Sequence, residues 1–180
     1  IDNISVSSQV PATYTSVATG NWSDPATWGG SVPSIADNAI VASGHTVTIN
    51  AAGQGIQNLT VSGTLTYGAT PTEFQAKDLT VWGLPAQLAG GVVNVFAGTT
   101  AKTLRVSGNI VNHGRINTLA SSSANGTLNL NGSALQTISG TGTWGGTVSS
   151  ATSTNEVGVI GILSITNNST AIPNINYTMG

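Results

Sequence analysis

Apolar residues alternate with threonine, serine and asparagine along most of the chain, and this period of two predicts β-strands. No long stretch shows the spacing that marks an amphipathic helix. A phrase, Leu-x-Val-x-Gly, recurs at Leu59, Leu79 and Leu104, and a variant with Leu130 in place of valine begins at Leu128. The leucines are 20, 25 and 24 residues apart, a period typical of folds built from stacked repeats.

These repeats predict an all-β protein, a single parallel β-helix or solenoid, in which each coil carries two or three short strands. Stacked coils would bury Leu, Val and Ile inward and leave Thr, Ser and Asn in ladders outside. Residues 71–77 interrupt the pattern, and we expect them to bulge out between coils. Later rungs are expected at residues 135–140, 147–148, 163–167 and 172–175.

The first part of the chain differs from the rest. Asp24 and Pro25, within residues 23–28, supply a polar cap followed by proline at a first helical position, which predicts one short helical turn. Such a turn would cover the open end of the solenoid. We therefore divide the chain into an N-terminal strand or docking segment, residues 1–13, and a β-helix domain, residues 14–180, with a cap at about residues 14–44.

Charge is scarce: only 6% of the 180 residues are charged, with a net charge of -2, where soluble domains carry about 25%. No basic stripe exists to neutralise phosphates, so nucleic-acid binding is excluded. The longest apolar run, residues 157–165, is far shorter than the roughly 18 residues of a membrane span, so we expect no membrane insertion. The chain opens with Ile1 rather than methionine, which favours an exported, processed or excised chain.

Residues for catalysis or metal binding do not gather in the sequence. No cysteine is present, and His45 and His113 lack metal-site spacing. Asp24 and Asp37 are interpreted as a helix N-cap and a turn residue. The acids are scattered, at Asp2, Asp24, Asp37, Glu73, Asp78 and Glu156. We therefore expect no enzyme, no cofactor and no metal site.

Four tryptophans are candidates for packing or for binding. Trp22 and Trp28 are six residues apart and could share one face of an extended segment, where they would stack on a sugar ring. Packing over the first coil as part of the cap is the favoured interpretation of this pair. Trp82 and Trp144 are less constrained, and both are candidate surface platforms for glycan stacking.

Both chain ends carry partly alternating apolar residues that could pair with a sheet edge, either of the same chain or of a neighbouring copy. These candidate assembly residues are Ile4, Val6 and Val10 at one end and Ile172, Ile175 and Tyr177 at the other.

The segment GNWSDPATWGG at residues 20–30, followed by DNAIV at 37–41 and GHTVTI at 44–49, resembles the opening of eight-glycine (G-eight) type β-helix modules. Such modules occur in secreted surface proteins of Bacteroidota-type bacteria. The resemblance implies an exported, surface-bound or extracellular protein with an adhesive or structural role, and it supplies no catalytic residues.

The pattern therefore favours a non-enzymatic extracellular or cell-surface protein that assembles with copies of itself, through its ends or a terminal strand, into a filament or surface matrix. The alternative is an adhesin or carbohydrate-binding module of a larger surface protein, with glycans as partners. A polysaccharide lyase or hydrolase stands last, because the acids do not converge.

Overall fold

The structure is a computed structural model, and it describes residues 10–83, 90–97, 100–118, 126–144 and 162–166. Within these ranges nearly all regular structure is β-strand, and most strand pairs are parallel. The exception is a short antiparallel pair, β9 (Phe96–Ala97) with β10 (Thr100–Ala101). The predicted all-β class and its parallel pairing are confirmed.

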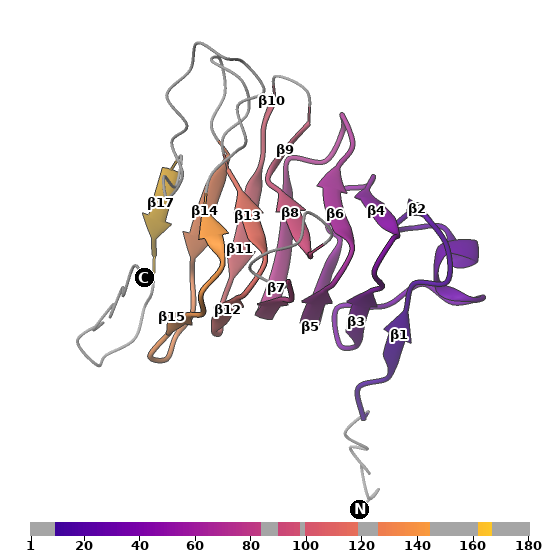
Figure 1. The fold of residues 1–180 in the computed structure, drawn as a ribbon, viewed down its shortest axis with the longest axis horizontal. Helices are drawn as coiled ribbons and strands as arrows, with labels where there is room; N and C mark the ends of the chain where they lie inside the picture. The colour runs from indigo at the N-terminus through magenta and orange to yellow at the C-terminus, as the bar shows by residue number, and fades with distance from the viewer. Residues whose placement is uncertain (1–9, 84–89, 98–99, 119–125, 145–161, 167–180) are drawn as a thin grey trace, which may run out of the picture.

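The strands lie side by side along the long axis of the molecule, from β1 and β2 at the N-terminal end to β17 at the other end (Figure 1). Each ladder, meaning a set of strands paired one after another, follows chain order.

In the part of the chain that the structure describes, no helix is both long and apolar enough to cross a membrane.

Three parallel ladders can be traced through the described residues. Ladder one contains β1 (Thr13–Thr15), β3 (Asn38–Val41), the second halves of β5 (Gly55–Val61) and β7 (Glu73–Val81), β12 (Ile110–Asn112) and β15 (Ile138–Ser139). Ladder two contains the first halves of β5 and β7, then β11 (Thr103–Val106), β14 (Thr127–Leu130) and β17 (Ile162–Ile165). Ladder three contains β2 (Gly20–Asn21), β4 (Thr46–Ile49), β6 (Thr64–Tyr67), β8 (Val92–Asn94), β13 (Arg115–Asn117) and β16 (Thr143–Trp144).

Ladders one and two share β5 and β7 because both strands bend. In β5, Ile56 and Asn58 enter the register with β7, but Gln57 between them does not. Gln57 and Asn58 both lie outside the buried core, whereas inward and outward side chains alternate in the rest of a regular strand. β7 bends in the same way at Lys77 and Asp78. The register offset is 20 residues on both sides of the interruption, so neither strand contains an extra residue, and the two strands turn together from one ladder to the other.

The alternating sequence buries every second side chain, as predicted. In β6, Leu65 and Tyr67 are buried, while Thr64 and Thr66, which alternate with them, are partly exposed. The same threonine positions face each other on neighbouring strands, since Thr46 pairs with Thr64 and Thr48 with Thr66. The core is therefore a column of aliphatic and aromatic side chains, with hydroxyl and amide groups outside.

The alignment of the repeated phrases is partly confirmed. Leu59 pairs with Leu79, and Leu104 pairs with Leu128, as their shared phrase predicts. Between these two pairs the alignment is wrong, because Leu104 pairs with Phe74 instead of Leu79. The nine-residue strand β7 supplies one half to each ladder. Its first half, which contains Phe74, pairs with β11, whereas the repeated phrase predicts that its second half, which contains Leu79, would do so.

The expected bulge at residues 71–77 is also wrong. Strand β7 begins at Glu73, and Phe74 is fully buried in the core. Its ring lies 4.8 Å from that of Trp22, measured between centroids. The aromatic contact and the pairing with β5 and β11 hold this segment in the sheet.

Of the later rungs, residues 138–139 and 162–165 form strands, whereas residues 147–148 and 172–175 lie outside the described residues. At the N-terminal end, β1 pairs in parallel with β3 of the same chain. The backbone NH of Asn38 donates to the carbonyl oxygen of Ala12 at 2.7 Å. From Ala12 onward the N-terminal segment is thus docked within its own molecule.

Candidate functional site

The N-terminal end of the core is closed by two tryptophans. Trp22 and Trp28 are both buried, with ring centroids 4.9 Å apart in an edge-to-face arrangement. The indole NH of Trp28 donates to the backbone carbonyl of Trp22 at 2.8 Å. The predicted packing of this pair is confirmed, and buried rings offer no face to a sugar.

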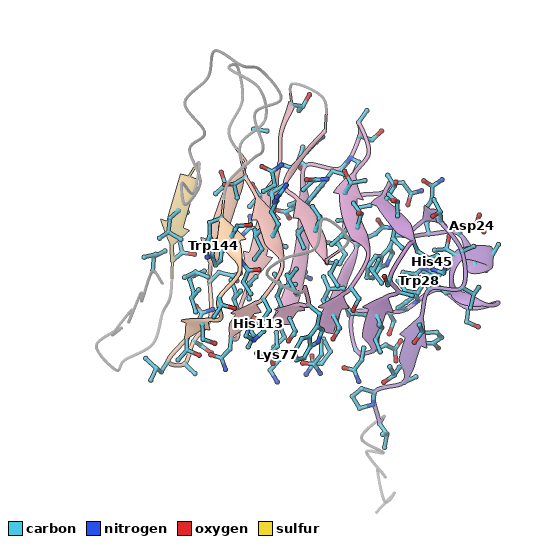
Figure 2. All side chains as sticks on the ribbon, in the orientation of Figure 1. Asp24, Trp28, His45, Lys77, His113 and Trp144 are labelled. Carbon is cyan, nitrogen blue, oxygen red and sulfur yellow. The ribbon has the colours of Figure 1, made fainter. Side chains whose placement is uncertain are left out.

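A single 3-10 turn, η1 (Pro25–Trp28), positions Trp28, as the sequence predicts. The Asp24 carboxylate accepts a hydrogen bond from the NH of Ala26 at 2.9 Å, which confirms its N-cap role. Gly29 ends the turn with φ = 78°, in the left-handed region that favours glycine. Figure 2 shows Asp24 and Trp28 together at this end of the molecule, near His45.

The carboxylate of Asp37 joins the N-terminal segment to the turn at residues 34–37. It accepts hydrogen bonds from the Ser34 hydroxyl at 2.6 Å, the Ser34 NH at 2.9 Å and the Ala12 NH at 3.1 Å. The two bonds from Ser34, helped by the weaker one from Ala12, lower the pKa of Asp37 below its ordinary value of 3.8, against the opposing effect of burial. The turn role predicted for Asp37 is confirmed, and its carboxylate is fully occupied by structural bonds.

Strand β17 is the last strand of ladder two among the described residues. Leu163 and Ile165 of β17 are 43% and 45% exposed, although they align with Leu128 and Leu130, which are 0% and 2% exposed. Among the described residues, β17 has a pairing partner on one side only, β14. This rung therefore presents apolar side chains and backbone hydrogen-bonding groups.

Of the predicted assembly residues, Val10 is the one that the structure describes, and it is 83% exposed just ahead of β1. The other five, Ile4, Val6, Ile172, Ile175 and Tyr177, lie outside the described residues.

The two predicted glycan platforms have different environments. Trp82 is 53% exposed and stacks on the ring of His113, with centroids 5.5 Å apart and planes 21° apart. Trp144 is only 9% exposed and belongs to the core, where it pairs with Ile116 in ladder three. The surface role predicted for Trp144 is therefore corrected to a core role, because its position in β16 points inward.

Both histidines lie beside strands, His45 directly before β4 and His113 after β12. The Ser16 hydroxyl lies 3.0 Å from Nδ1 of His45 and accepts a hydrogen bond from the NH of Ala42 at 2.9 Å. Ser16 is buried, so this pair ties the residues after β1 to those before β4 rather than exposing a nucleophile. His113 lies between β12 and β13, and its Nδ1 is 3.4 Å from the Thr141 hydroxyl.

The acidic side chains that the structure describes have structural partners. Glu73 forms an ion pair with Arg105, with 2.7 Å between Oε2 and Nε. Asp78 accepts a hydrogen bond from the NH of Asn109 at 2.7 Å and lies 4.0 Å from the Lys77 ammonium. In the described ranges, no three His, Cys, Asp or Glu side chains gather in a way that could hold a metal ion.

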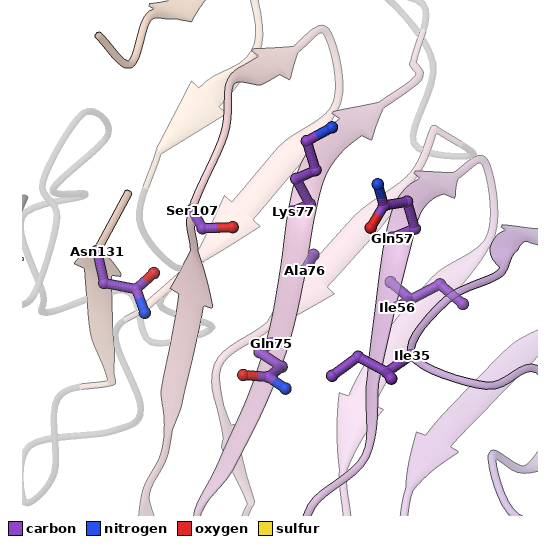
Figure 3. A pocket seen from close by; sticks show the side chains of 8 residues that line it. All are labelled: Ile35, Ile56, Gln57, Gln75, Ala76, Lys77, Ser107 and Asn131. Carbon is purple, nitrogen blue, oxygen red and sulfur yellow. The ribbon is translucent and has the colours of Figure 1, made fainter. Parts of the chain in front are cut away.

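Sequence reasoning missed a shallow pocket on the outer face, at the bend between ladders one and two. Its volume is about 230 Å³. Figure 3 shows the side chains that line it, which are Ile35, Ile56, Gln57, Gln75, Ala76, Lys77, Ser107 and Asn131. The signal in the sequence is faint, because these residues come from five separate segments and combine buried apolar positions of ladder two, Ile56 and Ala76, with polar residues beside them.

No protein-family model, no curated protein and no solved structure matches this chain.

Proposed function

We propose that this chain is a parallel β-helix that acts as a non-enzymatic structural protein, exported to the cell surface or the extracellular space. Copies of the chain would join end to end into a filament or surface matrix. Three ladders in chain order, with apolar residues inside and hydroxyl and amide groups outside, support the β-helix architecture. The likeness of residues 20–49 to G-eight modules supports the location.

The exposed last rung carries the assembly proposal. A partner strand seated on β17 would pair its open backbone edge and cover Leu163 and Ile165. A second copy fits this place, because its own strands have the same spacing and the same inward aliphatic residues. Scarce charge also favours contact between copies, since little like-charge repulsion opposes it.

The opposite surface of the contact would be the N-terminal end. Strand β1 is the first strand of ladder one, and the exposed Val10 precedes it. A contact between two different ends is heterologous and does not close on itself, so it propagates into a filament. Residues Ile4, Val6, Ile172, Ile175 and Tyr177 remain candidates for this contact.

Electron microscopy and sedimentation at rising protein concentration test the proposal. We expect the wild type to form filaments and the Leu163→Asp variant to stay monomeric, because a charge on the open rung would be buried unpaired in the contact. Trp82→Asp is the matched control, since Trp82 is 53% exposed directly after β7, a strand with partners on both sides, and it should assemble. A wild-type protein that remains monomeric at every concentration would contradict the proposal.

Removing residues 1–9 tests the N-terminal partner separately. This deletion leaves Ala12 and its bond to Asp37 in place, so the fold should persist. Assembly should weaken if these residues form part of the contact. Unchanged assembly would assign the contact to the remainder of the N-terminal end.

The alternative function, a carbohydrate-binding module, is supported by one observation, the exposed Trp82 stacked on His113. An exposed indole face can stack on a sugar ring. Glycan-array screening with wild type and Trp82→Ala tests it, with Leu135→Ala as a control for loss of an exposed apolar side chain. Glycan binding that survives in Trp82→Ala would remove this residue from the site.

A further inference from the structure

We infer that the outer pocket at the bend between ladders one and two is a binding site for one unit of an uncharged, hydroxyl-rich saccharide. Its volume of about 230 Å³ lies just under the usual range for small-molecule pockets, so it suits a single ring or a short stretch of a chain. The site is separate from Trp82, its lining runs from Ile35 in the N-terminal cap to Asn131 after β14, and it requires neither assembly nor glycan stacking.

The pocket is built on a row of side chains that run across four neighbouring strands, here called the corner row: Gln57, Lys77, Ser107 and Asn131. Lys77, Ser107 and Asn131 are in register, because the NH of Ser107 donates to the carbonyl of Ala76 at 3.1 Å and that of Asn131 to Val106 at 3.0 Å, whereas Gln57 leaves the register at the bend of β5. Neighbouring strands are about 4.8 Å apart, so the row spans about 14 Å. A fixed spacing of this kind can hold an extended ligand along the axis of the molecule.

An unsatisfied polar atom lies in this row. The side-chain oxygen of Asn131 is buried and has no hydrogen-bond partner among the described residues. In Figure 3 its amide group points toward Ser107 and the rest of the pocket. Buried acceptors normally have a donor, and a rotation of the amide that brings this oxygen to the pocket surface would let a ligand hydroxyl group donate to it.

The remaining lining suits a sugar in both its polar and its apolar parts. Gln57 and Gln75 carry amides, which donate and accept at once, as the hydroxyl groups of a sugar do. The Gln75 side chain lies against Gly55, where a Cβ would stand 2.5 Å from Gln75 Cγ, so the glycine makes room for it. Ile35, which is 54% exposed, adds an apolar surface for the CH groups of a ring.

Charge at the site favours an uncharged ligand over an acidic one. The Lys77 ammonium lies 4.0 Å from the Asp78 carboxylate. On the neighbouring strand, Arg105 is paired with Glu73 at 2.7 Å. Each cation thus has an anion beside it, and the surface holds no surplus positive charge to attract carboxylate or sulfate groups.

Titration followed by NMR of the side-chain amide signals tests the site. The probes are neutral cello-, manno- and xylo-oligosaccharides, with oligogalacturonate as the acidic comparison. We expect a neutral probe to shift the amide signals of Gln57, Gln75 and Asn131 with a Kd in the millimolar range, little changed by added salt. Gln75→Ala and Asn131→Ala should each weaken binding about fivefold, the effect of one lost hydrogen bond.

Matched controls separate this site from the rest of the surface. Thr80→Ala changes an outward residue on the same strand as Gln75, and Asn58→Ala removes an exposed amide outside the pocket, so both should bind like the wild type. Trp82→Ala should also bind normally, which distinguishes this site from the glycan platform considered above.

Three results would overturn the inference. One is the absence of any shift with all neutral probes at about 10 mM. Another is tighter binding of oligogalacturonate than of every neutral probe. The third is unchanged affinity in Gln75→Ala, an exposed residue whose replacement is not expected to disturb folding.

Discussion

The first and last described layers of the fold differ in how far their apolar side chains are covered. Every stack of strands has a first and a last layer whose apolar side chains lack a neighbour on one side. At the N-terminal end, Trp22 and Trp28 close the core through an edge-to-face contact and an indole hydrogen bond. On the last rung of ladder two, Leu163 and Ile165 remain nearly half exposed.

The difference lies in the sequence next to each end strand. After β2 the chain supplies an N-cap, a proline and a tryptophan within five residues, 24–28, and these fold back over the core. Strand β17 follows the ladder pattern, which buries a side chain where strands lie on both sides, and β14 is its one partner among the described residues. The alternating pattern alone therefore builds layers but cannot finish a stack, and closing an end requires a separate piece of sequence.

The largest effect is expected at the closed end. Trp22→Ala removes a ring that contacts both Trp28 and Phe74, and the resulting cavity should lower the free energy of unfolding by about 3–5 kcal/mol. Trp82→Ala, at an exposed position, should cost about 0.5 kcal/mol. Urea denaturation of both variants measures the difference, and equal losses would contradict the closed-end interpretation.

The next effect compares two aligned leucines in ladder two. Leu128→Ala should destabilise the protein by about 2–5 kcal/mol, because Leu128 is fully buried. Leu163→Ala, one strand later, should cost about 1 kcal/mol or less, since much of its side chain is already in water. The measurement belongs at low protein concentration, where association does not add to stability. A large loss in Leu163→Ala would show that this rung is closed in solution.

The smallest effect is a pH dependence at the closed end. Hydrogen bonds from Ser34 hold the pKa of Asp37 below its ordinary value of 3.8, so the charged form stabilises the fold. That contribution is fully present above the unfolded pKa and is lost as pH falls through the lower, folded pKa. We expect Asp37→Asn to lose about 1.5–3 kcal/mol at pH 7, and to show a weaker loss of stability than the wild type between about pH 5 and pH 2.

Asp24→Asn is the control for this experiment, because asparagine also caps helical turns. Its stability at pH 7 should stay close to that of the wild type, and its acid unfolding should resemble that of the wild type. If Asp37→Asn and the wild type lose stability in parallel on acidification, Asp37 does not stabilise the closed end through its charge.

Much of the fold could be predicted from local pattern, because each residue's neighbours in sequence decide which face of a strand it takes. The leucine phrases pair as expected for Leu59 with Leu79 and for Leu104 with Leu128. The prediction failed at β7, since Leu104 pairs with Phe74. Pro71 lies two residues before β7 and led us to expect an interruption there instead of a strand. No local signal in the sequence indicates that a nine-residue strand bends and contributes to two ladders.

The surface was harder to predict than the core. Trp144 lies in a glycine-rich stretch, and the sequence suggests an exposed ring there. In the structure its side chain is buried in β16, beside Ile116 of the neighbouring strand. The pocket depends on side chains from β5 and β7 and on residues that come after β11 and β14, and only the register brings them together. A site of this kind becomes visible once the pairing of strands is known.

Chain order within the ladders gives the fold a direction of growth. Paired residues are between 18 positions apart, as in Thr46 with Thr64, and 35 positions apart, as in Thr127 with Ile162. On a chain that emerges N-terminus first, the tryptophan-closed end can nucleate early, and each later strand then adds to a template that is already in place. Folding by such templated addition leaves a single growing front, which moves toward β17 as the chain lengthens.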